Sequence, residues 1–377
     1  MGFAIGKPLG SQGETHIVEY ASALVALGHR VVVVAPEGKV TPRLPRGLTL
    51  MTVPGDARSK KNPLPSTVLA LRLARVLGKL AKELDILHTP PFPEFGFRLA
   101  PLAKAPSVLH VTSLPVSSAA ACRVGRAVVR RQSRLYNRTV TVAGELSRSI
   151  FGRDDGVVSI GVNVDRFRPG RNAALRERLG LAPGEPLGLY VGTMGRVRNL
   201  PVLLAAIAQA VATTGRGRFL FVGGGVASVG ALAAHAARLG IADRVHFEGS
   251  VSFDLVPEYL KAADFGLAYV PEKPQFRDQP PLKTIEYLAA GLPVIATDTR
   301  GNRLFVTDGE NGLVTRDNAA AVAGAISRLV TDAVLRSKLG EKARASALAF
   351  DYRLITEEQL LPVYRSAISA YRSRRAC

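Results

Sequence analysis

The residues with the clearest chemical potential stand at the start of one short helix. Between Gln275 and Asp298 the chain reads QFRDQPPLKTIEYLAAGLPVIATD. The two prolines exclude a helix before Leu282, because proline lacks an N–H donor and restricts the residue before it. After them, apolar residues recur at helical spacing, and the stretch closes with a short apolar run typical of a buried strand. A helix start offers unpaired N–H groups, which suit a phosphate.

Four polar side chains surround this helix start. Lys283 and Thr284 fall in its first turn, Glu286 lies one turn further on, and Asp278 precedes Glu286 by eight positions. The helix dipole disfavours a cation in the first turn by up to ~1 kcal/mol unless an anion is present. Each residue alone is compatible with a solvated helix. Together, two carboxylates flanking a phosphate-ready helix predict a ligand that contains phosphate.

The elements that position these residues alternate between strands and helices. Near-continuous apolar runs such as RVVVVAP and LGLYVGTM predict buried parallel strands, and amphipathic helices lie between them. This pattern predicts an α/β protein with two doubly wound sheets. We expect an N-terminal domain over 1–170 and a second domain over 171–354. A last helix over about 355–377 is expected to pack back on the first domain.

Three further candidates follow from their places at the ends of predicted strands. His88 ends the strand LDILHTP, and His110 and Thr112 end the strand SVLHVTS. Ligands of open α/β sheets bind at the carboxyl ends of strands. The alternative is that each histidine is structural. Gly10 and Gly13 lie in an early loop where the backbone could approach a ligand, but their spacing is not the dinucleotide fingerprint G-x-G-x-x-G.

Composition limits the function classes. The two cysteines and six scattered histidines form no metal-binding spacing, so no metal site is expected. No apolar stretch approaches the ~20 residues of a membrane span, and no signal peptide is evident. We therefore expect a cytoplasmic protein of 377 residues with a net charge of +20.

The basic excess is denser in the first 170 residues and gathers in two runs, Arg58–Lys82 and Arg123–Arg138. Each predicts a basic amphipathic helix, which could lie on an anionic membrane surface at the inner face of the cell membrane. A solvated helix face is the alternative. Nucleic acid is not expected, because no binding module is visible and aromatics do not interleave with the basic residues.

Five segments together resemble the retaining GT-B glycosyltransferases of family 4, the "glycosyl transferases group 1" type. They are GETHIVEYASALVALGHRVVVVAP, IGVNVDRFRP, YVGTMGRVRNL, VHFEGSV and the pair Asp278-x7-Glu286. Respectively, they resemble the opening loop–helix–strand, the "GVD…F-P" entry to the second domain, the "VGR…KG" phosphate segment, the turn beside the base, and the Glu-x7-Glu carboxylates. Their order along nearly the whole chain strengthens the resemblance.

The resemblance implies a hexosyltransferase that uses a nucleotide-diphosphate sugar, UDP- or GDP-linked, without metal or other cofactor. The acceptor would be lipid-linked, a glycan or a small molecule. The implied catalytic residues are Asp278, Arg198 and His110. The implied donor-binding residues are Gly13, Arg196, Arg198, Gly224, Val245, Phe247, Asp278, Leu282, Lys283, Thr284 and Glu286.

Three positions differ from the family pattern. Asp278 replaces the usual glutamate, Thr193 replaces the arginine of the "VGR" segment, and Thr112 stands where a histidine is common, so that His110 becomes the candidate. These differences keep other functions open. One is a catalytically silent nucleotide-sugar-binding protein, and another is a nucleotide-sugar epimerase on the same fold.

Overall fold

The protein divides into two compact units. The structure is a computed structural model that describes residues 2–4, 15–37, 46–54, 64–80, 83–91, 104–154 and 156–376. The first unit comprises Met1–Gly161 and Tyr352–Cys377, and the second comprises Val162–Asp351. The boundaries expected from the sequence, after residues 170 and 354, fall slightly later than these divisions. The chain therefore leaves the first unit, builds the second, and returns to the first.

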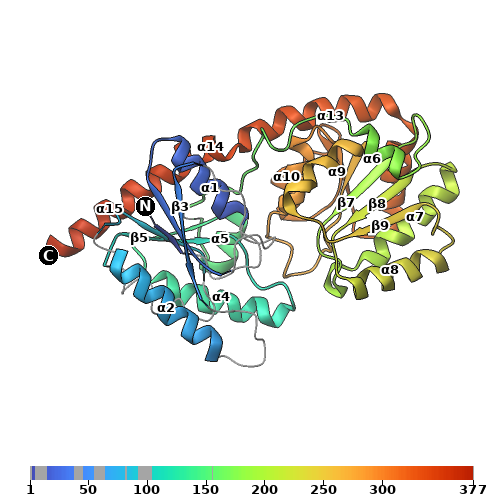
Figure 1. The fold of residues 1–377 in the computed structure, drawn as a ribbon. Coiled ribbons are helices and arrows are strands. Elements are labelled where there is room, and N and C mark those ends of the chain that lie inside the picture. The colour runs from blue at the N-terminus through green and yellow to red at the C-terminus, as the bar shows by residue number, and fades with distance from the viewer. Residues whose placement is uncertain are drawn as a thin grey trace. The chain divides into compact units, whose positions relative to one another are not determined.

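The first unit contains a six-stranded sheet in which every described strand pair is parallel (Figure 1). The strands are β1 (Gly2–Ala4), β2 (Val31–Pro36), β3 (Leu48–Val53), β4 (Leu87–Thr89), β5 (Ser107–Val111) and β6 (Arg138–Thr141). Their order, β3-β2-β1-β4-β5-β6, is that of a doubly wound fold. The sheet grows outward in both directions from the β1–β4 pair.

Helices of the first unit are amphipathic and bury one face. They are α1 (Thr15–Ala26), α2 (Leu64–Leu80), α4 (Ala119–Ser133), α5 (Gly144–Phe151), α14 (Tyr352–Ile355) and α15 (Leu361–Ala376). In α2, Leu69, Leu73 and Leu77 recur every four residues and pack in one cluster with Val34 of β2. This spacing places them on one side of the helix, which explains why the segment folds onto the sheet.

The sequence patterns did not predict strand β3. It lies at the edge of the sheet and pairs only with β2. Within it, only Val53 is buried, while Thr49, Met51 and Thr52 are exposed. An edge strand buries little surface, so its hydrophobic pattern is weak.

The second unit contains another six-stranded sheet with only parallel pairs. Its strands are β7 (Leu187–Val191), β8 (Arg218–Val222), β9 (Val245–Gly249), β10 (Phe265–Ala268), β11 (Val294–Thr297) and β12 (Gly312–Thr315). Their order is β12-β11-β10-β7-β8-β9, which repeats the doubly wound order of the first unit. The strand order reverses between β7 and β10.

Helices cover both faces of this second sheet (Figure 1). They are α6 (Ala173–Arg178), α7 (Leu200–Thr214), α8 (Val226–Arg238), α9 (Val256–Ala262), α10 (Leu282–Ala289), α11 (Arg300–Arg303), α12 (Ala319–Thr331) and α13 (Ala333–Ala347). Helices α7, α8 and α12 share one apolar core with the sheet. In α7, Leu200, Leu203, Leu204 and Ile207 are buried and form an apolar stripe along the helix.

Helix α10 packs on the opposite face, in contact with the backbone of β10. A Cβ added at Gly266 would lie 2.4 Å from Cδ2 of Tyr287, so only glycine lets the helix approach this closely. The Tyr287 hydroxyl accepts a hydrogen bond of 2.7 Å from the N–H of Val191, the last residue of β7. The short helix is therefore fixed against both strands at which the order reverses.

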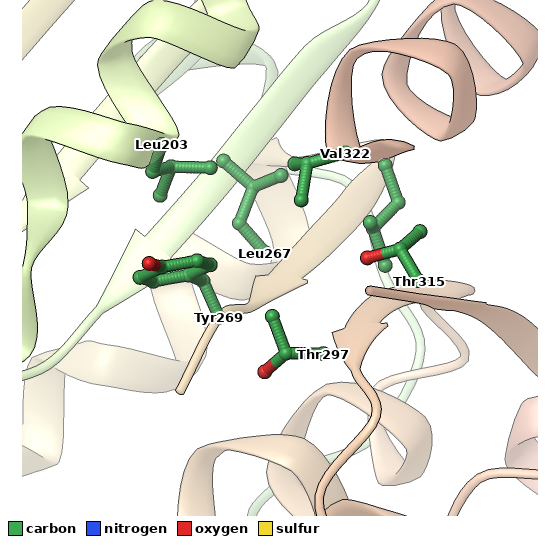
Figure 2. A pocket seen from close by; sticks show the side chains of 7 residues that line it. Leu203, Leu267, Tyr269, Thr297, Thr315 and Val322 are labelled. Carbon is green, nitrogen blue, oxygen red and sulfur yellow. The ribbon is translucent and has the colours of Figure 1, made fainter. Parts of the chain in front are cut away.

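A small gap lies in the core of the second unit beneath the loop that follows β10 (Figure 2). Leu203, Leu267, Tyr269, Ile295, Thr297, Thr315 and Val322 line it. The Thr297 hydroxyl donates to the carbonyl of Val270 and accepts from its N–H. The buried Thr315 hydroxyl, by contrast, has no hydrogen-bond partner in the described part of the chain.

We expect Thr315→Val to stabilise the second unit by about 1 kcal/mol, because an unsatisfied buried hydroxyl costs roughly that much and valine has the same shape. Urea unfolding of the second unit measures this. Thr297→Val is the matched control and should lower the free energy of unfolding by roughly 1–3 kcal/mol, since it leaves Val270 without its partner. An equal loss of the free energy of unfolding in both variants would contradict the conclusion that the Thr315 hydroxyl is unsatisfied.

Candidate active site

The two loops that leave the carboxyl ends of β7 and β10 begin side by side, because these strands are neighbours. The loop after β7 contains a one-turn 3-10 helix, Arg196–Arg198. The loop after β10 runs through Asp278 to the start of α10. In a doubly wound sheet this reversal point is where ligands bind. The segments that the sequence singled out therefore meet at the expected edge.

Arg198 is held at this edge by two contacts. Its Nε donates to the Thr193 hydroxyl at 2.9 Å, and its guanidinium lies 4.6 Å from the centroid of the Phe276 ring. The next residue, Asn199, has φ +52°, a left-handed conformation that asparagine tolerates better than most residues. Thr193, which replaces an arginine of the family pattern, thus orients Arg198. The side chain of Arg196, in the same turn, is exposed.

Lys283, in the first turn of α10, reaches the same edge. Its Nζ donates to the carbonyl of Tyr269 at 2.8 Å and lies 3.9 Å from the centroid of the Tyr190 ring. The loss of water around the ammonium, followed by the charge of Arg198, lowers its pKa well below the usual value. The site therefore holds two neighbouring basic groups in contact with aromatic rings, and a bound anion would favour the charged form of Lys283.

Among the residues that the structure describes, no carboxylate forms an ion pair with Arg198 or Lys283. Two nearby positive charges repel each other, and an anion between them would remove that repulsion. The N–H groups of Leu282 and Lys283 add donors, since no backbone acceptor for them occurs in the described ranges. This arrangement is a site for an anion such as a diphosphate.

The N–H and hydroxyl groups of Thr284 form hydrogen bonds within the protein. Thr284 is fully buried, its N–H donates to the carbonyl of Pro281 at 3.1 Å, and its hydroxyl donates to Oδ1 of Asn302 at 2.9 Å. The Asn302 amide in turn donates to the carbonyls of Ala268 and Thr297 at 3.1 and 2.9 Å. One buried asparagine thus ties the start of α10 to the ends of β10 and β11.

The two predicted carboxylates, Asp278 and Glu286, are both 8% exposed. One precedes the start of α10 and the other follows it. Glu286 projects from the second turn of α10, and Asp278 lies in the loop before it. Oδ1 of Asp278 is 3.3 Å from Nη1 of Arg300, which belongs to α11. The structure thus places Asp278, Arg198, Lys283 and Glu286 in the same region of the second unit.

The glycines after β8 are explained by packing. A Cβ at Gly223 would lie 2.1 Å from the carbonyl oxygen of Gly192, and one at Gly224 would lie 2.9 Å from Cβ of Met194. The carbonyl of Gly224 also accepts from the Ser250 hydroxyl at 2.8 Å. Gly224 therefore lies at the carboxyl edge of the sheet, where close backbone contact requires glycine, and its contact with a donor stays a prediction. Gly13 lies outside the described residues.

The prediction that Val245 contacts a ligand does not agree with the structure. Val245 is the first residue of β9, pairs with Phe219, and is buried in the apolar core. The Phe247 ring packs on Phe221, with centroids 5.1 Å apart. Because strands are parallel, the residue of β9 at the carboxyl edge is Gly249, about 13 Å from Val245 at ~3.3 Å per residue.

His110 was predicted to be catalytic, but it is 1% exposed in the first unit and bonded at both ring nitrogens. Its Nε2 donates to the carbonyl of Val158 at 3.2 Å, so its Nδ1 must accept from Nε2 of His88, also at 3.2 Å. Nδ1 of His88 then accepts from the hydroxyl of Tyr364 at 2.7 Å. Both histidines are structural links between the sheet and helix α15.

Two family models match the chain. The model described as "Glycosyltransferase Family 4" matches residues 13–166, and the model described as "Glycosyl transferases group 1" matches residues 185–332. This chain belongs to the family 4, or group 1, glycosyltransferases. The two matched segments correspond to the two compact units, and the cation site lies in the group 1 segment.

Curated relatives in this family include two named D-inositol 3-phosphate glycosyltransferase. The protein of Nocardia farcinica is 33% identical over 259 residues, which cover 66% of this chain and 56% of the relative. The protein of Streptomyces scabiei is 34% identical over 261 residues, with 66% and 57% covered. The aligned region thus spans little more than half the length of the curated relatives.

Solved structures show the fold. A sucrose-phosphate synthase from Thermosynechococcus elongatus superposes with a TM-score of 0.80 at 21% identity, covering 98% of this chain and 99% of that one. HepE of Anabaena, solved with UDP and glucose, gives 0.77 at 17% identity, covering 97% and 99%. The fold of this family 4 member is therefore GT-B, with two Rossmann-like units.

Several residues at the site escaped the sequence patterns. Tyr190 and Phe276 lie under the two cations, and Asn302 and Arg300 come from a short helix that follows β11. Tyr190 lies within the buried strand β7, so in the sequence it looks like an ordinary core residue. The alternation of strand residues indicates burial but not the identity of a partner from another loop.

We expect the stability of the first unit to fall as pH drops from about 6.5 toward 3. Burial, followed by the charge of His16, lowers the pKa of His110 to about 3, and burial, followed by His110, lowers the pKa of His88. As pH falls, these histidines therefore bind protons in the unfolded chain before they do so in the folded one. Each histidine then lowers the free energy of unfolding by up to ~1.4 kcal/mol per pH unit in this range. Tyr20 of α1 and Tyr364 of α15, which face this pair, stay neutral because burial raises their pKa values.

Unfolding of the first unit in urea between pH 7 and 4 measures this slope. His110→Asn should reduce the slope, even if it lowers stability at pH 7. His246→Asn is the control, because His246 lies exposed on the edge strand β9 of the second unit. A slope unchanged by His110→Asn would show that this pair does not set the pH dependence.

Proposed function

We propose that the protein is a retaining glycosyltransferase that moves a hexose from a nucleotide-diphosphate sugar to an acceptor without a metal ion. The observation that carries this proposal is the pair Arg198 and Lys283, two cations at the strand reversal with no carboxylate partner among the described residues. Membership of the family 4 glycosyltransferases supports the reaction class. The positions of Asp278 and Glu286 support the remainder of the donor site.

In this proposal each part of the donor has its own partner. The diphosphate lies between Arg198, Lys283 and the N–H groups of Leu282 and Lys283. Glu286 accepts hydrogen bonds from the ribose hydroxyls, and Asp278 accepts them from hydroxyls of the sugar. Gly224 and the backbone near it lie closer to the base, and Arg196 can approach the diphosphate from its exposed position.

The mechanism follows from where charge develops. Breaking the bond between sugar and diphosphate puts negative charge on the phosphate oxygens and positive charge on the sugar ring. Arg198 and Lys283 are already held in place by Thr193, Phe276 and Tyr190, so they stabilise the leaving diphosphate without reorganising. Attack from the face that the diphosphate leaves, with a phosphate oxygen as base, gives retention.

The relatives support a range of donors and acceptors. HepE was solved with UDP and with UDP-glucose, which favours UDP over GDP as the nucleotide. The curated relatives are named for inositol 3-phosphate, and one structural neighbour is a sucrose-phosphate synthase. These names favour a small phosphorylated acceptor, alongside the lipid-linked and glycan acceptors considered from the sequence. We place the enzyme in the cytoplasm.

Donor turnover tests the proposal. Purified protein is incubated with UDP- and GDP-hexoses, with inositol phosphates or lipid-linked glycans as acceptors, in the presence of EDTA, and release of nucleoside diphosphate is followed. Arg198→Ala should lower kcat by roughly 10²–10³-fold, as expected for a lost preorganised donor. Glu286→Ala should mainly raise the donor KM, by about tenfold, which corresponds to ~1.4 kcal/mol of binding.

Arg218→Ala is the matched control, because Arg218 begins β8 at the amino edge of the same sheet and pairs with Glu185. It should keep full turnover. If Arg198→Ala and Glu286→Ala also kept full turnover, the site assignment would be wrong. If wild-type protein bound UDP but turned over no donor, the silent binding protein would replace the proposed enzyme.

We also propose that the first unit contacts an anionic membrane surface through α4 and α2. On α4, Arg123 and Arg131 are exposed, as are Arg134 at its C-terminal cap and Val124, whose exposed fraction is 64%. On α2, Val68 and Leu71 are 41% and 49% exposed among basic residues. Within the described ranges, no helix is long and apolar enough to cross a bilayer. Exposed apolar side chains among arginines suit the interface instead.

Co-sedimentation with vesicles checks this interaction. Vesicles rich in phosphatidylglycerol should pull the protein down at low salt, and neutral phosphatidylcholine vesicles should not. Arg123→Glu with Arg134→Glu should abolish binding to the anionic vesicles. The control pair Arg216→Glu with Arg238→Glu changes charge equally on the second unit and should leave it intact. Failure of the wild-type protein to sediment would rule out the membrane surface.

A further inference from the structure

The backbone at Arg300 is anchored close to Asp278. Arg300 is the first residue of α11, whose start is capped by the Thr299 hydroxyl, which accepts from the N–H of Asn302 at 3.2 Å. Asn302 is fully buried and bonded to the ends of two strands and to α10. This anchoring fixes the backbone from which the Arg300 side chain extends.

The turn of α11 that contains Arg300 packs closely against the loop that contains Asp278. The N–H of Gly301 donates to the carbonyl of Arg277 at 3.0 Å, and a Cβ at Gly301 would lie 2.3 Å from the carbonyl oxygen of Gln279. Arg300 and Asp278 therefore belong to two backbone segments in direct contact. The fold therefore sets the distance between the two backbones, and the Arg300 guanidinium reaches to within 3.3 Å of Asp278.

Most of the Arg300 guanidinium remains available. Its side chain is 63% exposed, and a single nitrogen, Nη1, lies 3.3 Å from Asp278, whose side chain is 10% exposed. Within the ranges that the structure describes, Arg300 has no other polar partner. The second amino group and Nε, which form the other edge of the planar fork, are free to bind a ligand.

The loop next to Arg300 offers few donors of its own. Pro280 and Pro281 have no N–H, the N–H of Gln279 donates to the carbonyl of Phe276 at 3.2 Å, and the Gln279 amide donates to the carbonyl of Gln275. Between Asp278 and Leu282 the backbone therefore presents no spare donor. At this end of the site the main donor is the fork of Arg300, and the main acceptor is Asp278.

We propose that Arg300 determines donor specificity by binding the carboxylate of an acidic sugar, so that the transferred unit is a hexuronic acid. This inference rests on the proposed function. A guanidinium fork matches a carboxylate through two parallel hydrogen bonds, whereas the hydroxymethyl group of a neutral hexose leaves one of them unmade. Asp278 keeps its role as acceptor for sugar hydroxyls, and Arg300 separates its charge from that of the sugar carboxylate.

The test compares matched donors that differ only in this group: UDP-glucuronate against UDP-glucose, and GDP-mannuronate against GDP-mannose. Both kcat/KM and the dissociation constant are measured for each. Wild-type protein should favour the uronate of its preferred nucleotide at least tenfold. Arg300→Gln should reduce that preference at least tenfold, mainly through KM, and Arg300→Lys should recover part of it.

Arg303→Gln is the matched control, since Arg303 lies on the same helix and forms two hydrogen bonds with Asp298. It should keep the wild-type preference. A wild-type preference for the neutral hexose, or an equal effect of Arg300→Gln on both donors, overturns the inference while leaving the proposed function intact. If no donor is turned over, the proposed function fails, and the ratio of dissociation constants still decides the role of Arg300.

Discussion

The candidate site of the second unit depends on two basic side chains that the fold holds close enough to repel each other. Arg198 and Lys283 come from different loops, yet the reversal of strand order between β7 and β10 brings both to one edge. Tyr190 and Phe276 hold them there through their ring faces, which attract cations without neutralising them. Among the residues that the structure describes, no carboxylate pairs with either side chain, and an anionic ligand would remove the repulsion.

The rest of the site follows from keeping α10 in place. The helix is only eight residues long, too short to be stable alone, so its position depends on contacts with the sheet. Tyr287 fixes one side of it through Gly266 and Val191, and Asn302 fixes its start. The buried hydrogen bonds of Tyr287 and Asn302 therefore hold α10 in place, and with it the polar side chains on the outward face of this helix.

Much of this could be predicted from the sequence, and the exceptions have physical reasons. The α10 segment and the buried strands were predictable because proline, glycine and apolar spacing are local signals. Val245 was misplaced because a strand has two ends, and only topology tells which one meets the loops. His110 was misassigned because its environment includes Tyr364, far along the chain. Arg300 was missed because nothing near it in the sequence marks its contact with Asp278.

The return of the chain to the first unit has a consequence for folding. The sheet of that unit is complete by residue 141, but its buried histidine pair is bonded to Tyr364 of the last helix. During synthesis the second unit, which is continuous in sequence, can reach its final form while the first still lacks that helix. The unit translated first is thus completed last, because its core around His88 includes a side chain of the last helix.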